Sequence, residues 1–214
     1  MTRLLVATRS DHKLREIRQI LSCFPGLEVV DLRDEGIPET SDEEGIEIFE
    51  TFQENALAKA RYFASRSELP VLADDSGLCV DALGGAPGVR SKRFSGRSDL
   101  RGARLDEANN ALLLERMEGV SDPERTARYV CAAALVLPDG AEHVSRGECE
   151  GVILRELRGE GGFGYDPLFL LPGEGETFGQ LAPERKDLLS HRGTAVRAAL
   201  EWLVRGLDDS RNNA

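Results

Sequence analysis

Apolar runs and amphipathic stretches alternate along the chain, which predicts strands and helices in turn. Short apolar runs bounded by turn residues predict strands over Arg3–Thr8, Leu27–Leu32, Val71–Ala73, Ala127–Leu137 and His143–Cys149. An apolar spacing of 3.6 residues predicts helices that begin after Thr8 or Ser10, after Thr51 and after Ser190, and one over Leu105–Met117. We therefore expect an α/β protein.

Two adjacent carboxylates, Asp74 and Asp75, follow the apolar run Val71–Ala73. We expect the strand to stop there, because Ser76 and Gly77 are typical of a turn, and ligands of open α/β sheets collect at strand ends. Neighbouring side chains of an extended segment point to opposite sides, so one acid should face a ligand and the other the scaffold. The ligand-facing acid could hold a hard divalent cation. An ordinary acidic turn is the alternative.

The first predicted strand leads through a short turn into a helix, and such a turn presents backbone N–H groups to a phosphate. Lys13 would lie in the first turn of that helix, either near such a phosphate or as a solvated surface lysine. The turn matches neither a P-loop nor a dinucleotide-binding fingerprint.

A glycine-rich segment, Gly159–Phe169, contains Phe163 and Tyr165. Aromatic rings among glycines suit a flat ligand such as a nucleobase, and Asp166 could accept hydrogen bonds from its nitrogens. A tight turn with a tyrosine anchor is the alternative interpretation.

The helix predicted after Ser190 carries His191 and Arg192 in its first turn, where the positive end of a helix disfavours cations unless an anion is near. This placement points to a binding site. We expect the helix to stop at Gly206, with residues 1–206 as a single domain in two lobes and residues 207–214 as a flexible tail.

Composition narrows the class of protein. The chain has 214 residues with 41% hydrophobic content, which is typical of a globular protein, and no apolar run of membrane-spanning length. Its start has no secretion-signal pattern, and its four cysteines include no C-x-x-C pair, so we expect a cytoplasmic protein without a zinc site. A net charge of −11 argues against a nucleic-acid binder but allows a nucleotide substrate.

Six ordered motifs resemble those of the inosine triphosphate pyrophosphatase family, and the resemblance runs from Leu4 to about Leu203. They are Ala7-Thr-x-x-x-x-Lys13, Thr51-Phe-x-Glu-Asn-Ala56 with Lys59-Ala60, Leu72-Ala-Asp-Asp-Ser-Gly-Leu78, Leu83-Gly-Gly-Ala-Pro-Gly88, Gly161-Gly-Phe-Gly-Tyr-Asp-Pro167 and Ser190-His-Arg-Gly193. The resemblance implies an elongated mixed sheet flanked by helices, two lobes with the active-site cleft between them, and a homodimer. It also implies Mg²⁺-dependent hydrolysis of ITP, dITP and XTP to the monophosphate and pyrophosphate.

The same resemblance implies roles for individual residues. Asp75 would be the proton acceptor and a Mg²⁺ ligand together with Glu47, while Asp74 supports it. The phosphates and sugar would contact Thr8, Arg9, Ser10, Asp11, His12, Lys13 and Ser76. The base would contact Phe163, Gly164, Tyr165, Asp166, Lys186, His191 and Arg192. Phe163 would stack on it, and a donor such as His191 or Arg192 would read the carbonyl that distinguishes hypoxanthine from adenine.

Two departures from the family pattern bear on these roles. Ser10 stands where the family usually has Asn, and the acidic loop before Thr51 offers Glu43, Glu44 and Glu47 as competing metal ligands, of which counting back from Thr51 favours Glu47. A pyrophosphatase of broader specificity and a nucleotide sensor without turnover are the rival interpretations.

Overall fold

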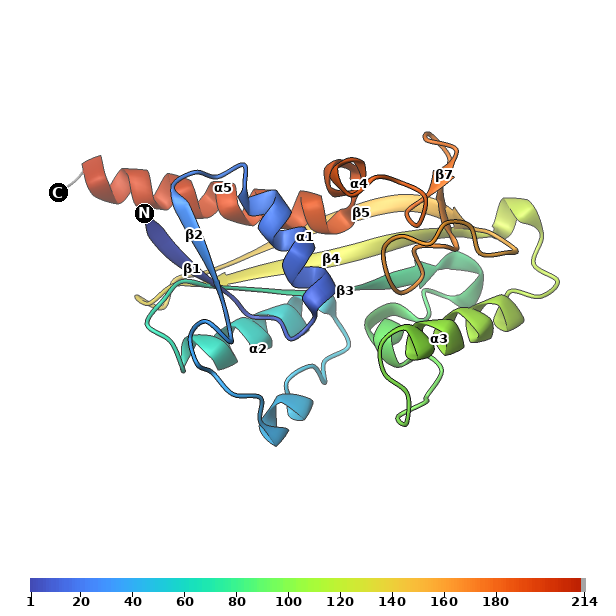
Figure 1. Ribbon diagram of the computed structural model, residues 1–214, viewed down its shortest axis with the longest axis horizontal. Coiled ribbons are helices and arrows are strands. Elements are labelled where there is room, and N and C mark those ends of the chain that lie inside the picture. Colours follow the sequence, from blue (N-terminus) through green and yellow to red (C-terminus); the bar gives the residue numbers. More distant parts are fainter. Residues whose placement is uncertain (213–214) are drawn as a thin grey trace. The chain divides into compact units, whose positions relative to one another are not determined.

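The computed structural model describes residues 1–212 and shows an α/β protein (Figure 1). Within these residues seven strands form one sheet in the order β2-β1-β3-β4-β5-β6-β7. Their bounds are Thr2–Val6 (β1), Leu27–Asp31 (β2), Val71–Val80 (β3), Thr126–Val136 (β4), Glu142–Ile153 (β5), Phe169–Leu171 (β6) and Glu176–Thr177 (β7). β1 pairs in parallel with β2 and β3, whereas β6 pairs antiparallel with β5 and β7. The predicted mixed sheet and α/β class are confirmed.

The chain divides into two compact units. Unit 1 comprises Met1–Asp75, Cys131–Gly147 and the segment from His191 onward, and unit 2 comprises Ser76–Val130 and Glu148–Ser190. The strands β3, β4 and β5 contribute residues to both. The expected single domain in two lobes and its cleft stay predictions.

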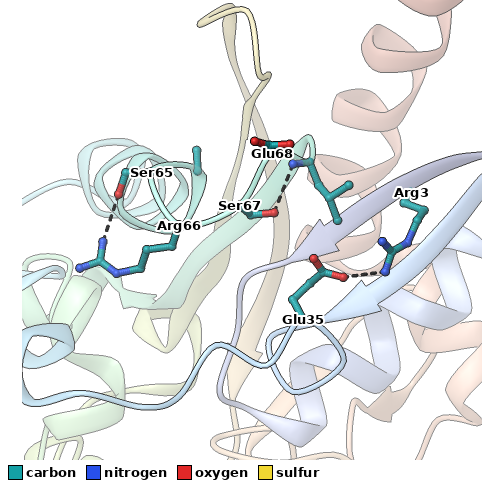
Figure 2. Close-up of a pocket in the computed structure, with 8 residues that line it drawn as sticks. Arg3, Glu35, Ser65, Arg66, Ser67 and Glu68 are labelled. Carbon is teal, nitrogen blue, oxygen red and sulfur yellow. Dashed lines mark hydrogen bonds and ion pairs between the residues drawn. The ribbon is translucent and has the colours of Figure 1, made fainter.

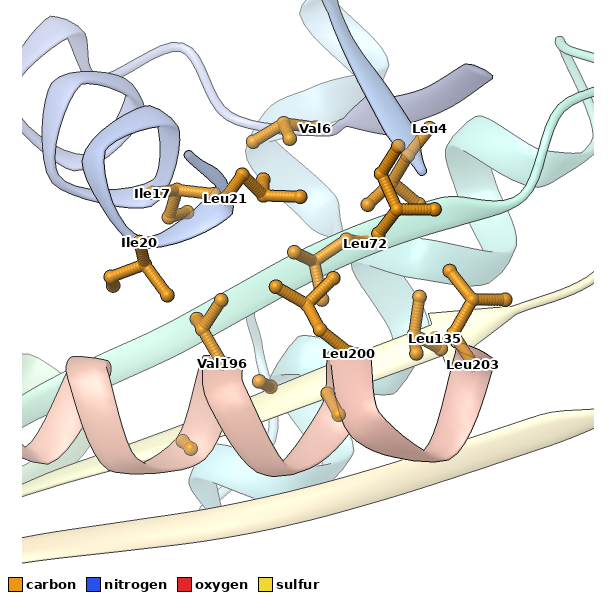
Figure 3. Close-up of a cluster of buried hydrophobic side chains, with 14 of the residues drawn as sticks. Leu4, Val6, Ile17, Ile20, Leu21, Leu72, Leu135, Val196, Leu200 and Leu203 are labelled. Carbon is orange, nitrogen blue, oxygen red and sulfur yellow. The ribbon is translucent and has the colours of Figure 1, made fainter. Parts of the chain in front are cut away.

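Unit 1 contains the helices α1 (Asp11–Leu21), α2 (Phe52–Ala64) and α5 (His191–Asn212) and the short 3-10 helix η1 (Ser41–Gly45). α1 and α5 pack on one face of the strands, and α2 lies on the opposite face (Figure 1). Leucine, isoleucine and valine side chains from β1, α1, β3, β4 and α5 interdigitate in the core of this unit (Figure 3). Their burial supplies the main driving force that fixes α1 and α5 on the sheet.

Unit 2 contains α3 (Ala103–Arg116), α4 (Pro183–Leu189) and the 3-10 helices η2 (Asp81–Leu83), η3 (Gly88–Arg93) and η4 (Asp122–Glu124). Its core combines aliphatic side chains with a group of aromatic rings, in which the ring centres of Tyr129 and Phe169 lie 4.7 Å apart and those of Phe169 and Phe178 5.1 Å apart. The buried side chains of α3 are Leu105, Asn109, Asn110 and Leu113. Ala108 and Leu112 of the same helix are partly exposed.

Two predicted boundaries are wrong. β3 does not stop at the acids but continues to Val80, so Ser76 and Gly77 form strand and not a turn. The strand can continue because its carboxylates have buried polar partners in place of water. Helix α5 passes Gly206 and ends at Asn212, since a glycine in a helix costs only about 1 kcal/mol relative to alanine. Residues 213–214 of the expected tail lie outside the described residues.

Candidate functional site

Asp74 and Asp75 occupy the middle of β3, where successive side chains point to opposite faces of the sheet. Asp74 is fully buried and Asp75 nearly so. On one face, Asp74 Oδ2 lies 3.0 Å from Lys13 Nζ and 3.1 Å from Arg192 Nε. On the other, Asp75 Oδ2 accepts a hydrogen bond of 3.0 Å from Asn55 Nδ2 of α2. The two acids therefore have separate surroundings, as the alternation of a strand predicts.

Asp74 is the centre of a buried ion-pair cluster in unit 1. Arg192, at the start of α5, pairs with Asp74 and also with Glu16 of α1. Burial by itself would raise the pKa of the Asp74 carboxyl, but the positive charges of Lys13, Arg192 and Lys59 hold that pKa well below its usual range. Asp74 is thus a permanent anion that ties β3 to α1 and α5.

The anion that we expected near the first turn of α5 is supplied by the protein itself. Arg192 lies at the positive end of the helix and is buried, and its pKa is raised because Glu16 and Asp74 outweigh the effect of burial. Cys131 of β4 lies nearby, with Sγ 3.9 Å from Asp74 Oδ2. Burial and the Asp74 charge raise the pKa of this thiol, so it stays protonated.

Asp75 has the opposite electrostatic character. Burial raises the pKa of its carboxyl, and the neighbouring negative charge of Glu47 raises it further, against the lowering effects of Lys13, Lys59 and Asn55. A carboxylate destabilised in this way is suited to accept a proton or to bind a cation.

The structure distinguishes the three glutamates of the acidic loop. Glu43 forms a two-pronged ion pair with Arg9, at 2.7 and 3.0 Å. Glu44 is exposed to solvent. Glu47 pairs with the buried Lys59 of α2 and is close enough to Asp75 to affect its pKa. Of the three, Glu47 is the one placed to share a ligand with Asp75.

These carboxylates fit a magnesium ion better than a metal held by protein side chains alone. Within residues 1–212, no group of three or more His, Cys, Asp or Glu side chains is arranged to hold a metal ion. Mg²⁺ commonly takes only one or two carboxylates and completes its shell with water and substrate phosphates. Burial and, to a smaller extent, the negative charge of Glu47 raise the pKa of Asp75, and a bound cation would offset both effects.

The turn before α1 is built by local hydrogen bonds. Ser10 caps the helix by accepting from the Lys13 N–H at 3.4 Å, and Thr8 Oγ1 accepts from the Ser10 N–H at 3.1 Å. Asp11 is exposed and pairs with Arg33, while the exposed His12 contacts Arg15.

The residues of this turn differ in what they contact. Lys13 joins the Asp74 cluster. Arg9 donates to the carbonyls of Ile37 and Pro38 in addition to its pair with Glu43, and so holds the acidic loop.

A second cluster lies in unit 2 around Asp166. Its Oδ2 accepts from Lys186 Nζ at 2.6 Å and from the Phe163 N–H at 2.8 Å, and its Oδ1 accepts from the Tyr129 hydroxyl at 3.3 Å. Lys186 Nζ also lies 5.1 Å from the centre of the half-buried Phe163 ring. Asp166 therefore holds both Lys186 and the Phe163 loop in place.

The second aromatic of the glycine segment is part of the core. Tyr165 is 3% exposed, and its hydroxyl donates to the Ser91 carbonyl at 2.8 Å. We expected its ring to suit a flat ligand, but the ring packs against side chains from other segments of unit 2. The alternative interpretation, a tyrosine anchor in a tight turn, describes Tyr165 correctly.

The remaining predicted residues are Ser76, Gly164 and His191. Ser76 is half-buried in β3, and Gly164 donates its N–H to Asp106 at 2.9 Å and accepts from Asn110. His191 is 3% exposed at the start of α5. A Cβ at Gly147 of β5 would lie 2.2 Å from the His191 carbonyl oxygen, so glycine allows this helix start to lie against the sheet.

A surface pocket of unit 1 lies away from this chemistry (Figure 2). Its lining includes the ion pair Arg3–Glu35 and the segment from Ala64 to Leu69. Arg3 lies near the start of the parallel strand β1, and the segment from Ala64 to Leu69 precedes β3, whereas ligands of such sheets collect at the carboxyl ends. We therefore place the candidate site at Asp75 and not at this pocket.

Several residues of the clusters had no role assigned from sequence. Asn55 and Lys59 lie in one of the family motifs, but the sequence does not show that the Asn55 side chain is buried and the Lys59 side chain largely so. Glu16, Tyr129 and Cys131 join the clusters from α1 and β4, and no local pattern marks them.

The chain is similar to known proteins over almost its whole length. The model of the Ham1 family matches residues 4–202. A "dITP/XTP pyrophosphatase" of Frankia alni is 51% identical over 196 residues, covering 91% of this chain and 94% of that protein. A protein of the same name from Escherichia coli is 43% identical and covers 96% and 100%.

Solved structures agree with these sequence matches. A HAM1 protein from Coxiella burnetii has a TM-score of 0.80 at 35% identity and covers 96% of this chain and 100% of that one. A dITP/XTP pyrophosphatase from Mycobacterium abscessus has a TM-score of 0.67 at 43% identity, with coverage of 94% and 100%. In addition, none of the helices within residues 1–212 combines the length and apolar character needed to span a bilayer.

Replacing Asp74 should destabilise the protein in a pH-dependent way. Asp74→Asn leaves the buried Arg192 and the half-buried Lys13 without their shared anion, so the free energy of unfolding should fall by about 3–5 kcal/mol at neutral pH. Because the folded pKa of Asp74 is depressed, its stabilising contribution is present above the unfolded pKa of about 4 and is lost as pH falls below it. Urea unfolding of both proteins between pH 3 and 7 should show the difference shrinking below about pH 4. Asp99→Asn, in an exposed pair with Arg97, is the control and should not move the midpoint; a pH-independent loss for Asp74→Asn would contradict the assignment.

The Phe163 loop should depend on glycine at position 162. A Cβ there would lie 2.0 Å from Asp166 Oδ2, and the φ angle is +72°. Gly164 has a φ of +61° and nothing within 4 Å of its Cβ position, so Gly164→Ala is a matched control for backbone strain alone. Urea unfolding should show a larger loss of stability for Gly162→Ala, and equal losses would show that Asp166 is not held as described.

Proposed function

Because this chain belongs to the Ham1 family, we propose that it hydrolyses non-canonical purine nucleoside triphosphates such as dITP, ITP and XTP to the monophosphate and pyrophosphate. This is a hydrolase activity on an acid anhydride bond, and it would clear deaminated purines from the nucleotide pool. The observation that carries the proposal is the pair of unlike carboxylates in β3, with Asp74 held as an anion and Asp75 destabilised as one.

Asp75 is the residue to which we assign the proton transfer. A water molecule held by its carboxylate attacks the α-phosphorus, its proton passes to Asp75, and the bond between the α-phosphorus and the bridging oxygen breaks to release pyrophosphate. The raised pKa of Asp75 favours this step because a more basic carboxylate accepts a proton more readily.

Mg²⁺ is the proposed cofactor, held by Asp75 and Glu47, and when bound it would neutralise charge on the triphosphate. Lys13 and Lys59 lie among the same carboxylates and are the cations available for phosphate oxygens. In our proposal the phosphates and sugar contact Ser76 and the turn from Thr8 to Lys13.

We assign recognition of the base to the Asp166 cluster together with His191 and Arg192. In this proposal the half-buried ring of Phe163 stacks on the base. Asp166 holds the Phe163 backbone and the Lys186 side chain in position through hydrogen bonds. A donor aimed at the carbonyl of hypoxanthine would reject adenine, because the adenine amino group would leave that donor unpaired. His191 or Arg192 supplies it in this proposal, with Gly164 and Tyr165 shaping the loop. On family resemblance alone, we also propose that the protein forms a homodimer and acts in the cytoplasm.

Product analysis tests this function directly. We expect dITP and XTP, but not dATP or dGTP, to yield monophosphate and pyrophosphate in Mg²⁺ and nothing in EDTA. Orthophosphate and a nucleoside diphosphate would instead indicate attack at the γ-phosphorus, and turnover of all four nucleotides would indicate the broader pyrophosphatase.

Asp75→Asn separates the enzyme from a nucleotide sensor. We expect turnover to fall by about 10²–10⁴-fold, the usual contribution of a general base, while dITP still binds and the free energy of unfolding stays equal or rises. Turnover at the original rate would remove Asp75 from the mechanism.

A further inference from the structure

Asn55 lies where the acidic loop, helix α2 and strand β3 meet. It belongs to α2 in unit 1 and is 1% exposed. Its Nδ2 donates to Asp75 Oδ2 at 3.0 Å and to the Phe49 carbonyl at 3.1 Å, and its Oδ1 accepts from the Phe49 N–H at 2.9 Å. One side chain therefore connects Asp75 to the segment that carries Glu47.

The orientation of this amide follows from its partners. The backbone of Phe49 presents a donor and an acceptor, so the Asn55 oxygen must face the N–H and the nitrogen must face the carbonyl. The second hydrogen of the same nitrogen then points to Asp75. Aspartate at this position would place a carboxylate oxygen against the Phe49 carbonyl and the Asp75 carboxylate, which are both acceptors. A longer or apolar side chain would not form these three hydrogen bonds.

The acidic loop has little apolar packing to fix it in this region. Ile48 is 68% exposed and Phe49 is 42% exposed. Glu47 forms an ion pair with Lys59, which orients its carboxylate. The lysine side chain is long and flexible, however, so this pair alone does not fix the loop. The two hydrogen bonds to the Phe49 backbone are the rigid attachment, two residues from Glu47.

We propose that Asn55 is a positioning residue that sets the separation between Asp75 and Glu47 and thereby the affinity for the divalent cation. The inference rests on the proposed function, because it takes these two carboxylates as the cation's ligands. Groups that hydrogen-bond to metal ligands from outside typically change metal affinity by about 10–100-fold when they are removed.

The chain offers a matched control in unit 2. Asn109 is 2% exposed, its Oδ1 accepts from the Ser95 N–H at 2.8 Å, and its Nδ2 donates to the Lys92 carbonyl at 3.3 Å. It ties a loop to a helix just as Asn55 does, but the structure gives it no carboxylate partner. Loss of either amide should reduce stability, and only the loss of Asn55 should affect cation binding.

The test compares Asn55→Leu with Asn109→Leu, since leucine keeps the volume and removes the hydrogen bonds. Electron paramagnetic resonance measures free Mn²⁺ during titration of each nucleotide-free protein, and thermal unfolding confirms that each is folded. We expect the dissociation constant for Mn²⁺ to rise at least about tenfold for Asn55→Leu and to stay unchanged for Asn109→Leu. The Mg²⁺ concentration that half-saturates turnover should rise in parallel, with the same products.

A second variant tests the inference without a change in the core. Phe49→Pro removes the N–H that Asn55 accepts from at a partly exposed loop position, and it should weaken Mn²⁺ binding several-fold. Wild-type affinity in both Asn55→Leu and Phe49→Pro would overturn the positioning role while leaving the proposed function intact. If the unchanged protein binds no Mn²⁺ and hydrolyses dITP in EDTA, the Asp75–Glu47 cation pair itself is wrong.

Discussion

Two neighbouring residues of a β-strand must point to opposite faces of the sheet, and the rest of unit 1 depends on this constraint at Asp74 and Asp75. If both acids faced one side, their repulsion would have to be balanced at a single place. The strand instead separates them, so Asp74 joins α1 and α5 while Asp75 meets α2 and the acidic loop. The structural role of Asp74 and the proposed chemical role of Asp75 therefore fall to adjacent residues with separate surroundings.

The Asp74 cluster connects stability to the turn before α1, to which we assign phosphate contacts in the proposed function. A buried anion with one buried and one half-buried cation is costly to desolvate, and losing any one partner leaves the others uncompensated. Arg192 and Lys13 are therefore fixed in position by the same carboxylate, and Glu16 adds a second tie between α1 and α5. A lysine held rigidly at the start of a helix can meet a phosphate without first losing side-chain freedom.

Sequence patterns predicted the strands, the helices and the separation of the two acids, because each depends on local periodicity. They failed where the partner is distant in the chain. β3 continues through its acids because buried partners satisfy them, and Tyr165 packs in a core assembled from other segments. Asn55 lies in the motif Thr51–Ala56, but no local signal in the sequence shows that its amide reaches Phe49 and Asp75.

The central claim is that these two acids have opposite electrostatic character, and a carboxyl titration followed by ¹³C NMR tests it most directly. In metal-free protein, Asp74 should stay ionised throughout the acid range in which the fold survives, whereas Asp75 should take up its proton at a pH above the ordinary aspartate value of about 3.9. Titration of both carboxyls together near that ordinary value, or of Asp74 at the higher pH, would contradict the account.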